Sequence, residues 1–379
     1  MSSTGTVRPV TVEPRDRWPA RQFAALPDPF TLFDGEQLHG GRVAYETWGR
    51  LTPARDNAIL LFTGLSPSAH AASSAVDPSE GWWEPVLGPG KALDTNRWFV
   101  ICVNSLGSCF GSCGPASADP RSGRRYGVDF PAITIEDIAA AGRAVLAALG
   151  ISSLAVVAGA SLGGMASLAF TALFPGLAKR LISVSGTDAA SPFAIALRSV
   201  QREAVLTDPD WLQGQYPAGR NPRNGMRLAR KIGTITYRSP IEWQQRYGRL
   251  PADTPPPNKF IGEFLVESYL ENQAERFADA FDANCYLYLS RAMDRFDLAR
   301  HGGVDQVAQK SGAESALIIG VETDMLFRIE EQARVAQAFA RAGSRTQLVR
   351  VESASGHDAF LADTVPFEAA IRAFLTEHP

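Results

Sequence analysis

The chain has 379 residues, of which 45% are hydrophobic and 20% are charged. These fractions are typical of a soluble globular protein and exclude a disordered chain, a collagen-like chain and a coiled-coil rod. With 37 Lys and Arg against 40 Asp and Glu, the formal net charge is −3. Such a chain does not attract polyanions, so we expect neither nucleic acid nor an anionic membrane as its main partner. At about 150 residues per domain, the length predicts two or three domains, or one large α/β domain with an insertion.

The four cysteines are too few for a disulfide framework, and no second Cys or His pair stands at zinc spacing from them. We therefore expect reduced thiols and no metal site. Residues 1–20 carry charges such as Arg8 and Asp16 and lack an apolar core, so they do not resemble a signal peptide. No run of eighteen apolar residues could form a membrane-spanning helix. These observations predict a cytoplasmic protein with no membrane partner.

Short apolar runs alternate with helical patterns along most of the chain. Strands are predicted at residues 43–48, 57–62, 98–103, 154–158, 181–184, 316–319 and 347–351. Most of these runs are continuously apolar, which is typical of strands buried on both faces of a parallel sheet. Helices are predicted over residues 135–149, after the N-cap candidate Thr134, and over residues 165–173 and 330–342. The alternation predicts an α/β fold with a doubly wound, mostly parallel sheet.

Two segments depart from this alternation. Residues 1–25 are polar and rich in proline, and we expect a flexible tail. Residues 190–305 contain few strand-like runs but several Arg-rich helical patterns and three consecutive prolines at 255–257. We interpret this segment as a helical lid inserted into an α/β core formed by residues 26–189 and 306–379.

Residues 159–163 read Gly-Ala-Ser-Leu-Gly and match the G-x-S-x-G pattern of a nucleophile elbow. The pattern alone is weak, but here it follows a predicted strand and precedes a predicted helix, as the elbow requires. The two glycines leave room around a strained turn, and the helix start directs backbone N–H groups toward developing negative charge. The alternative is an ordinary strand–helix turn in which Ser161 caps the helix.

A nucleophilic serine needs a base and an acid that orients it, and in α/β-hydrolases the acid precedes the histidine in the chain. Asp324 stands just after the predicted strand at 316–319, and Glu322 is a rival nearer the strand. Of the five histidines, only His357 follows the last predicted strand in the expected order. We therefore predict a catalytic triad of Ser161, Asp324 and His357.

Further segments resemble one family, the homoserine O-acyltransferases of the α/β-hydrolase superfamily. The resemblance extends from residue 43 to residue 360 and is carried by residues 45–49, 81–83, 88–90, 104–107, 111–115, 159–165, 229–230, 235–239 and 355–358. Within this family the chain is most similar to the serine O-succinyltransferases, through residues 65–70, 102–109 and 198–203. Two positions depart from the pattern, because Leu162 stands where most relatives have Met and Cys113 where Thr is usual. Neither departure removes a catalytic side chain.

The resemblance implies a ping-pong acyl transfer from an acyl-CoA to the hydroxyl of an amino acid, with acyl-CoA as co-substrate and no other cofactor. Ser161 would attack the thioester, His357 would take its proton, and Asp324 would hold the imidazole in the correct tautomer. The backbone N–H groups of Leu65 and Leu162 would form the oxyanion hole.

The resemblance also implies how the zwitterionic acceptor binds. Arg230 matches the family's carboxylate-binding arginine, and Asp358 matches the residue that binds the ammonium group. The alternative for Arg230 is a solvated arginine in an Arg-rich helical segment.

The same resemblance suggests the substrates. Arg198 stands where relatives that use acetyl-CoA have Asn, so we expect Arg198 to select succinyl-CoA by pairing with its carboxylate. The alternative is a lid arginine bound to a neighbouring acid, with acetyl-CoA as donor. Leu65, Ser66, Pro67 and Ser68 are expected to shorten the acceptor pocket so that it fits L-serine better than L-homoserine.

The resulting prediction is an L-serine O-succinyltransferase that serves cysteine biosynthesis and forms a homodimer through its helical region. Alternatives within the family are serine O-acetyltransferase and homoserine O-acetyl- or O-succinyltransferase, the latter two serving methionine biosynthesis. An alternative of another class is an esterase or thioesterase, in which water replaces the acceptor. A lid that excludes water would favour the transferase.

Overall fold

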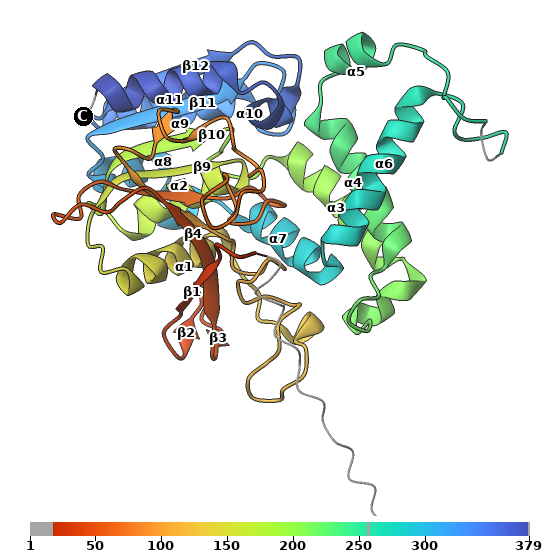
Figure 1. The fold of residues 1–379 in the computed structure, drawn as a ribbon, viewed down its shortest axis with the longest axis horizontal. Helices are drawn as coiled ribbons and strands as arrows, with labels where there is room; N and C mark the ends of the chain where they lie inside the picture. Colours follow the sequence, from red (N-terminus) through yellow and green to blue (C-terminus); the bar gives the residue numbers. More distant parts are fainter. Residues whose placement is uncertain (1–17, 256–257, 378–379) are drawn as a thin grey trace, which may run out of the picture.

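The computed structural model describes residues 18–255 and 258–377, and these form an α/β core with a helical lid beside it (Figure 1). Most of the predicted tail, residues 1–17, lies outside the described residues. Its last part was predicted wrongly: Gln22–Ala25 form strand β1, which pairs antiparallel with β4 (Arg42–Trp48). Ala24 is the one buried residue of β1, and a single buried alanine in a polar segment does not produce a recognisable strand pattern.

The core contains one eight-stranded sheet in the order β1-β4-β8-β5-β9-β10-β11-β12. After β1 and β4, its strands are β5 (Ala58–Phe62), β8 (Phe99–Val103), β9 (Leu154–Ala160), β10 (Ala178–Val184), β11 (Ser315–Val321) and β12 (Arg345–Val351). The pairs β1–β4 and β4–β8 are antiparallel, and all other pairs are parallel. The predicted mostly parallel sheet is confirmed, and β5, β9 and β11 are buried at every position.

Alternate residues of the strands face two separate apolar layers. On one face Leu60, Phe62 and Val157 belong to an apolar layer that also includes residues of helices α1 (Ile135–Ala148), α2 (Leu162–Leu173), α8 (Val304–Ser311) and α9 (Ile329–Arg341). On the other face Ile59 and Leu61 belong to an apolar layer that also includes residues of α11 (Val365–Glu377) and of the irregular segment 64–98. Small elements complete the core, namely β2 (Phe30–Thr31), β3 (Gln37–Leu38), β6 (Leu87–Gly88), β7 (Leu93–Asp94) and α10 (Ala359–Ala362). Both faces of the sheet are therefore covered, one by helices α1, α2, α8 and α9 and the other by α11 and segment 64–98.

The lid consists of helices α3 (Pro192–Leu206), α4 (Arg223–Tyr237), α5 (Pro240–Arg246), α6 (Leu265–Ala280) and α7 (Ala283–Arg295). The chain enters and leaves it through a neck, where Ala190 N–H donates to Phe296 O (3.1 Å) and Leu298 N–H donates to Asp188 O (2.8 Å). The lid therefore ends near residue 296 and not at residue 305, because α8 already packs on the core helices α2 and α9. The helical character of the insertion is as predicted.

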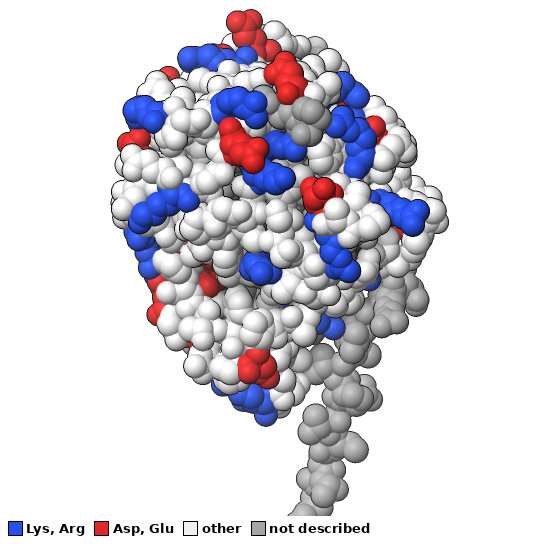
Figure 2. All heavy atoms as spheres, turned by 90° about the vertical axis from the view of Figure 1, so that its left-hand side faces the viewer, with Lys and Arg blue, Asp and Glu red and all other residues white. Residues whose placement is uncertain are grey.

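On the core face shown in Figure 2, basic and acidic side chains are scattered among uncharged residues. That face carries no extended basic stripe, which is the usual footprint of a nucleic-acid-binding protein. Across residues 18–255 and 258–377, no helix is both long enough and apolar enough to cross a membrane.

Candidate active site

The nucleophile elbow lies where β9 ends and α2 begins. Ser161 has φ 58° and ψ −120°, a strained conformation for a residue other than glycine. A Cβ on Gly159 would lie 2.0 Å from Gly163 O, and a Cβ on Gly163 would lie 2.2 Å from Phe62 O. Both glycines are thus required by close backbone approach, and the turn presents the Ser161 hydroxyl above the carboxyl edge of the sheet.

Three side chains meet at this edge. His357 Nε2 lies 2.7 Å from Ser161 Oγ, and His357 Nδ1 lies 2.7 Å from Asp324 Oδ2. All three residues are buried, with exposed fractions of 4–7%. Since a carboxylate accepts at Nδ1, the ring proton is on Nδ1 and Nε2 is free to accept the serine proton. The structure therefore brings together the three residues predicted to form the triad.

The neighbours of Asp324 explain why this acid and not Glu322 reaches the histidine. Asp324 Oδ1 accepts hydrogen bonds from the backbone N–H groups of Leu326 (2.9 Å) and Phe327 (3.0 Å), which aim Oδ2 at the imidazole. Glu322 instead points to the surface, where its carboxylate accepts from Arg350 Nε at 2.6 Å. The rival acid therefore lies outside the site.

The environment of His357 adjusts its basicity. Burial lowers the pKa of the imidazole, but the charge of Asp324 and the hydrogen bond to it outweigh burial and raise the pKa above its ordinary value of 6.5. The other described histidines have different carboxylate partners: Asp28 for His39, Glu46 for His70 and Glu136 for His301. His378 lies outside the described residues.

The predicted oxyanion donors border the same cavity as the nucleophile. Leu162 is the first residue of α2, so its N–H has no partner within the helix. Neither this N–H nor that of Leu65 donates to any group in the described part of the chain. Gly64, Leu65, Ser66 and Pro67 line the cavity beside Ser161. These two N–H groups are available to a developing oxyanion.

Ser68 differs from its three neighbours in the predicted acceptor segment. It is absent from the cavity wall, and its hydroxyl accepts hydrogen bonds from Arg21 Nη2 (3.1 Å) and His70 N–H (3.2 Å). We predicted that Ser68 shapes the acceptor pocket, but its side chain does not line the cavity. The reason is that the loop turns after Pro67, which directs Ser68 toward the buried pair of Arg21 and Glu46.

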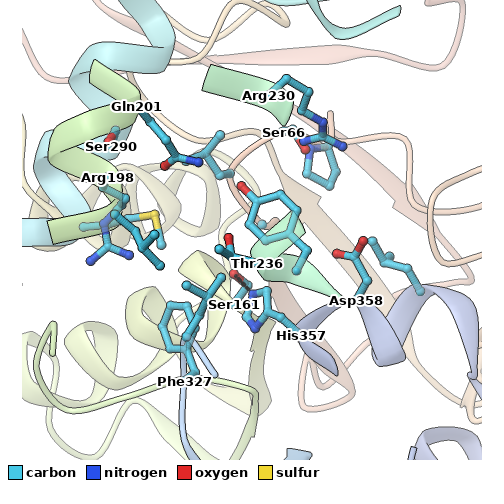
Figure 3. Close-up of a pocket in the computed structure, with 18 of the residues that line it drawn as sticks. Ser66, Ser161, Arg198, Gln201, Arg230, Thr236, Ser290, Phe327, His357 and Asp358 are labelled. Carbon is cyan, nitrogen blue, oxygen red and sulfur yellow. Dashed lines mark hydrogen bonds between the residues drawn. The ribbon is translucent and has the colours of Figure 1, made fainter. Parts of the chain in front are cut away.

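One end of the cavity holds Arg230 and Asp358, to the right of the triad in Figure 3. The Arg230 guanidinium lies over the rings of Tyr237 and Phe277, and its buried Nε has no hydrogen-bond partner in the described structure. Asp358 Oδ2 lies 3.2 Å from Arg238 Nε. Burial raises the pKa of Asp358 above its ordinary value, although the charges of Arg238 and His357 oppose this shift. A cation and an acid thus stand at one end of the site, as a zwitterion requires.

The opposite end of the cavity is formed by the lid helices α3 and α7, to the left in Figure 3. Arg198 lines it, with a side chain only 8% exposed. Its Nε donates to Asp294 Oδ1 at 2.5 Å, while its buried Nη2 has no partner among the described residues. The two predicted roles of Arg198 are therefore compatible, because it binds a neighbouring acid and still presents an unsatisfied donor.

Sequence reasoning missed several cavity residues. These are Leu197 and Gln201 on α3, Thr236 and Tyr237 on α4, Tyr286, Ser290 and Met293 on α7, and Leu326, Phe327, Phe360 and Leu361 in the core. One signal was available, since Tyr286, Ser290 and Met293 have the i, i+4, i+7 spacing of one helix face. That spacing does not reveal which partner the face meets.

The comparisons agree with this geometry. A family model described as alpha/beta hydrolase fold matches residues 57–364. The sheet, the elbow and the order of Ser161, Asp324 and His357 define the same class of protein. A serine O-succinyltransferase from Litchfieldella anticariensis is 51% identical over 360 residues, which cover 94% of this chain and 98% of the relative. An L-serine/homoserine O-acetyltransferase from Streptomyces lavendulae is 51% identical over 369 residues, which cover 94% of this chain and 97% of the relative.

Among solved structures, esterase E22 superposes with a TM-score of 0.85 and 30% identity, and the match covers 94% of this chain and 99% of the esterase. The fold alone therefore accommodates both acyl transfer and ester hydrolysis. At 51% identity over nearly the whole chain, however, the protein belongs to the serine and homoserine O-acyltransferase family of the α/β-hydrolases and is an acyltransferase.

Proposed function

We propose that this protein is an L-serine O-succinyltransferase. One observation carries the proposal: the two ends of the cavity, on opposite sides of Ser161, have different charged groups. Arg230 and Asp358 suit the carboxylate and ammonium of an amino acid, and Arg198 suits an acyl group that ends in a carboxylate. The relatives named above do not decide the donor, because one is named for succinyl and the other for acetyl at the same identity.

In the first half-reaction, Ser161 Oγ attacks the thioester carbonyl carbon while His357 Nε2 takes the serine proton. Asp324 stabilises the imidazolium, and the N–H groups of Leu65 and Leu162 bind the oxyanion, each contributing about 3 kcal/mol to the barrier reduction. The C–S bond then breaks, and His357 returns the proton to the CoA sulfur. This leaves succinyl-Ser161 and free CoA.

In the second half-reaction, the amino acid occupies the end where Arg230 and Asp358 lie. His357 takes the proton of the serine hydroxyl, whose oxygen attacks the acyl carbon, and Ser161 Oγ leaves with that proton. The products are O-succinyl-L-serine and free enzyme. Leu65, Ser66 and Pro67 line the cavity, with Ser66 beside Arg230 in Figure 3, and we expect them to fit the shorter acceptor, L-serine. A single methylene discriminates by only about 1–3 kcal/mol, so L-homoserine should retain measurable activity.

The direct test is a matrix of succinyl-CoA and acetyl-CoA against L-serine and L-homoserine, following free thiol and acylated product. We expect the highest kcat/KM for succinyl-CoA with L-serine. Mass spectrometry after exposure to succinyl-CoA alone should find the acyl group on Ser161, and Ser161→Ala should form no adduct. Near-normal turnover by Ser161→Ala would sink the covalent mechanism.

Arg198 is tested by Arg198→Ala. Loss of the guanidinium would leave the succinyl carboxylate buried and unpaired, so kcat/KM for succinyl-CoA should fall by about 100-fold or more. The value for acetyl-CoA should change little. Arg223→Ala is a matched control, because Arg223 is also a lid arginine but forms exposed ion pairs with Glu275 and Asp279. If the wild-type enzyme prefers acetyl-CoA, the proposed donor is wrong and acetyl-CoA takes its place.

Hydrolysis is the second candidate function, favoured by the similarity to esterase E22. It differs from transfer in one observable, the release of CoA thiol when no amino acid is present. A transferase releases one equivalent and then stops at the acyl-enzyme, whereas a thioesterase continues to turn over.

We also propose that two copies of the chain pair through the lid. Large apolar side chains are exposed there: Leu228, Ile235, Ile241, Leu250, Phe260 and Ile261, with exposed fractions of 47–80%. Contiguous apolar patches commonly mark protein–protein contacts, and we expect these side chains to form one. Sedimentation velocity of the full chain should give a dimer, and a monomer at all concentrations would refute the pairing.

A further inference from the structure

Two arginines on one face of α3 share a single carboxylate of α7. Arg198 Nε lies 2.5 Å from Asp294 Oδ1, and Arg202 Nη1 lies 2.6 Å from Asp294 Oδ2. The Asp294 side chain is 2% exposed, and those of Arg198 and Arg202 are 8% and 14% exposed. Arg202 Nη1 also donates to Ser290 Oγ at 2.9 Å. This cluster lies at the lid end of the active-site cavity, since Arg198 and Ser290 both line it.

The charges of this cluster do not balance. Two guanidinium groups against one carboxylate leave one net positive charge, and no other carboxylate in the described residues forms an ion pair with Arg198 or Arg202. A buried charge without a partner is unfavourable, so the cluster is suited to bind one more anion. Arg198 Nη2 is buried without a partner and marks where that anion would bind.

We propose that Asp294 is the positioning residue of the acyl-donor site. It holds Arg198 by Nε, which leaves the Nη1–Nη2 end of the guanidinium free for the terminal carboxylate of the acyl group. This inference deepens the proposed function and rests on it. Asp294 itself does not touch the acyl group and acts through Arg198.

Geometry and charge together explain why the acid at this position matters. An arginine side chain has several rotatable bonds, and fixing it before the substrate binds removes an entropic cost from binding. Without Asp294, the two guanidiniums would also repel one another across the lid. Arg198 would then lose the orientation that selects a carboxylate, whereas an acetyl group needs no such partner.

The test is Asp294→Asn, which keeps the shape of the side chain and removes its charge. The substitution also makes the cluster more positive, which by itself favours an anion. We nevertheless expect kcat/KM for succinyl-CoA to fall about 10- to 100-fold, mainly through KM, because the charge-assisted hydrogen bond that orients Arg198 is lost. The value for acetyl-CoA should stay within about threefold, so the ratio between donors should change. Asp279→Asn is the control, since Asp279 forms an exposed ion pair of the lid with Arg223.

Arg202→Gln tests the charge count independently and does not remove the acid. With Arg202 neutral, Asp294 fully compensates Arg198, so succinyl-CoA should bind several-fold more weakly and acetyl-CoA equally well. Binding is measured by calorimetry in the Ser161→Ala background, where no acyl transfer interferes. This second variant keeps the proposal testable if Asp294→Asn does not fold.

The possible outcomes are distinct. If the wild-type enzyme prefers acetyl-CoA, the proposed function fails. The role of Asp294 alone is overturned if three results coincide. The wild-type enzyme prefers succinyl-CoA, Asp294→Asn has a wild-type unfolding transition, and its kcat/KM values for the two donors either fall by the same factor or do not change. An unchanged donor ratio in Arg202→Gln would likewise contradict the charge count.

Discussion

His357 lies in an aromatic pocket that fixes the plane of its ring. Phe327 stacks on it with centroids 4.8 Å apart and an interplanar angle of 17°, while Phe360 approaches edge-on at 5.8 Å. The hydrogen bonds to Asp324 and Ser161 fix the rotation of the ring within that plane. The base therefore needs little reorganisation when the serine proton moves, which is the condition for efficient proton transfer.

The raised pKa of His357 predicts a pH dependence for the first half-reaction. Only neutral imidazole accepts the serine proton, so the rate of acyl-enzyme formation should increase as pH rises through a value above 6.5. Asp324→Asn removes the charge that raises this pKa and should move the acid limb to lower pH. Its rate should also fall by about 10⁴-fold because the wrong tautomer is favoured. Stopped-flow measurement of thiol release tests both effects, and an unmoved limb would contradict the assignment.

Asp358 predicts a second pH dependence, in the binding of the acceptor. The carboxylate must be ionised to bind an ammonium group, and its pKa is raised, chiefly by burial. The KM for L-serine should therefore increase as pH falls, beginning above the ordinary carboxyl range. Asp358→Asn should raise this KM about 10- to 100-fold and remove its pH dependence. Acyl-enzyme should still form, and loss of that first step would instead indicate a structural role.

At the scale of elements, the N-terminus of α1 is fixed by a capping box. Thr134 Oγ1 accepts from Asp137 N–H (3.3 Å), and Asp137 Oδ2 accepts from Thr134 N–H (2.7 Å). Thr134→Ala should lower the free energy of unfolding by about 1 kcal/mol, seen as a lower urea midpoint, with acyl transfer unchanged. The control is Thr376→Ala, at an exposed position near the end of α11 where no cap is lost. Equal midpoints for the two variants would refute the contribution of the cap.

The elements of the core were predictable because their signals are local. Continuous apolar runs gave β5, β9 and β11, and the glycines around Ser161 indicated the elbow. The ion pair between Arg198 and Asp294 was not predictable, because the two residues are 96 positions apart and the pair depends on how α3 packs against α7. β1 was missed for a similar reason, since a four-residue edge strand with a single buried side chain carries almost no pattern.

At the scale of the whole molecule, the reacting site lies between two structural units. The predicted triad and oxyanion donors belong to the core, while Leu197, Arg198 and Met293 belong to the lid. The lid therefore forms one end of the cavity, which is the end that we propose for the acyl group. Exclusion of water decides between transfer and hydrolysis, because water and the amino-acid hydroxyl compete for the same acyl-enzyme.

Met293→Ala tests whether the lid excludes water. Met293 is 4% exposed and lines the lid end of the cavity, so truncation opens space for water beside the acyl group. We expect the ratio of acyl-enzyme hydrolysis to transfer to rise about 3- to 10-fold, measured as thiol release with and without L-serine. Leu206→Ala is the control, because Leu206 is on the exposed face of α3. An unchanged ratio would show that another part of the site excludes water.

The neck at Asp188, Ala190, Phe296 and Leu298 has an evolutionary consequence. Because the two chain crossings are hydrogen bonded to each other, the inserted segment begins and ends at neighbouring points, and its length can change without displacing the sheet. The groups that we assign to donor choice lie inside this insertion, and the nucleophile, base and acid lie outside it. A lineage could therefore exchange one lid for another and acquire a new acyl donor, while its proton-transfer machinery is inherited intact.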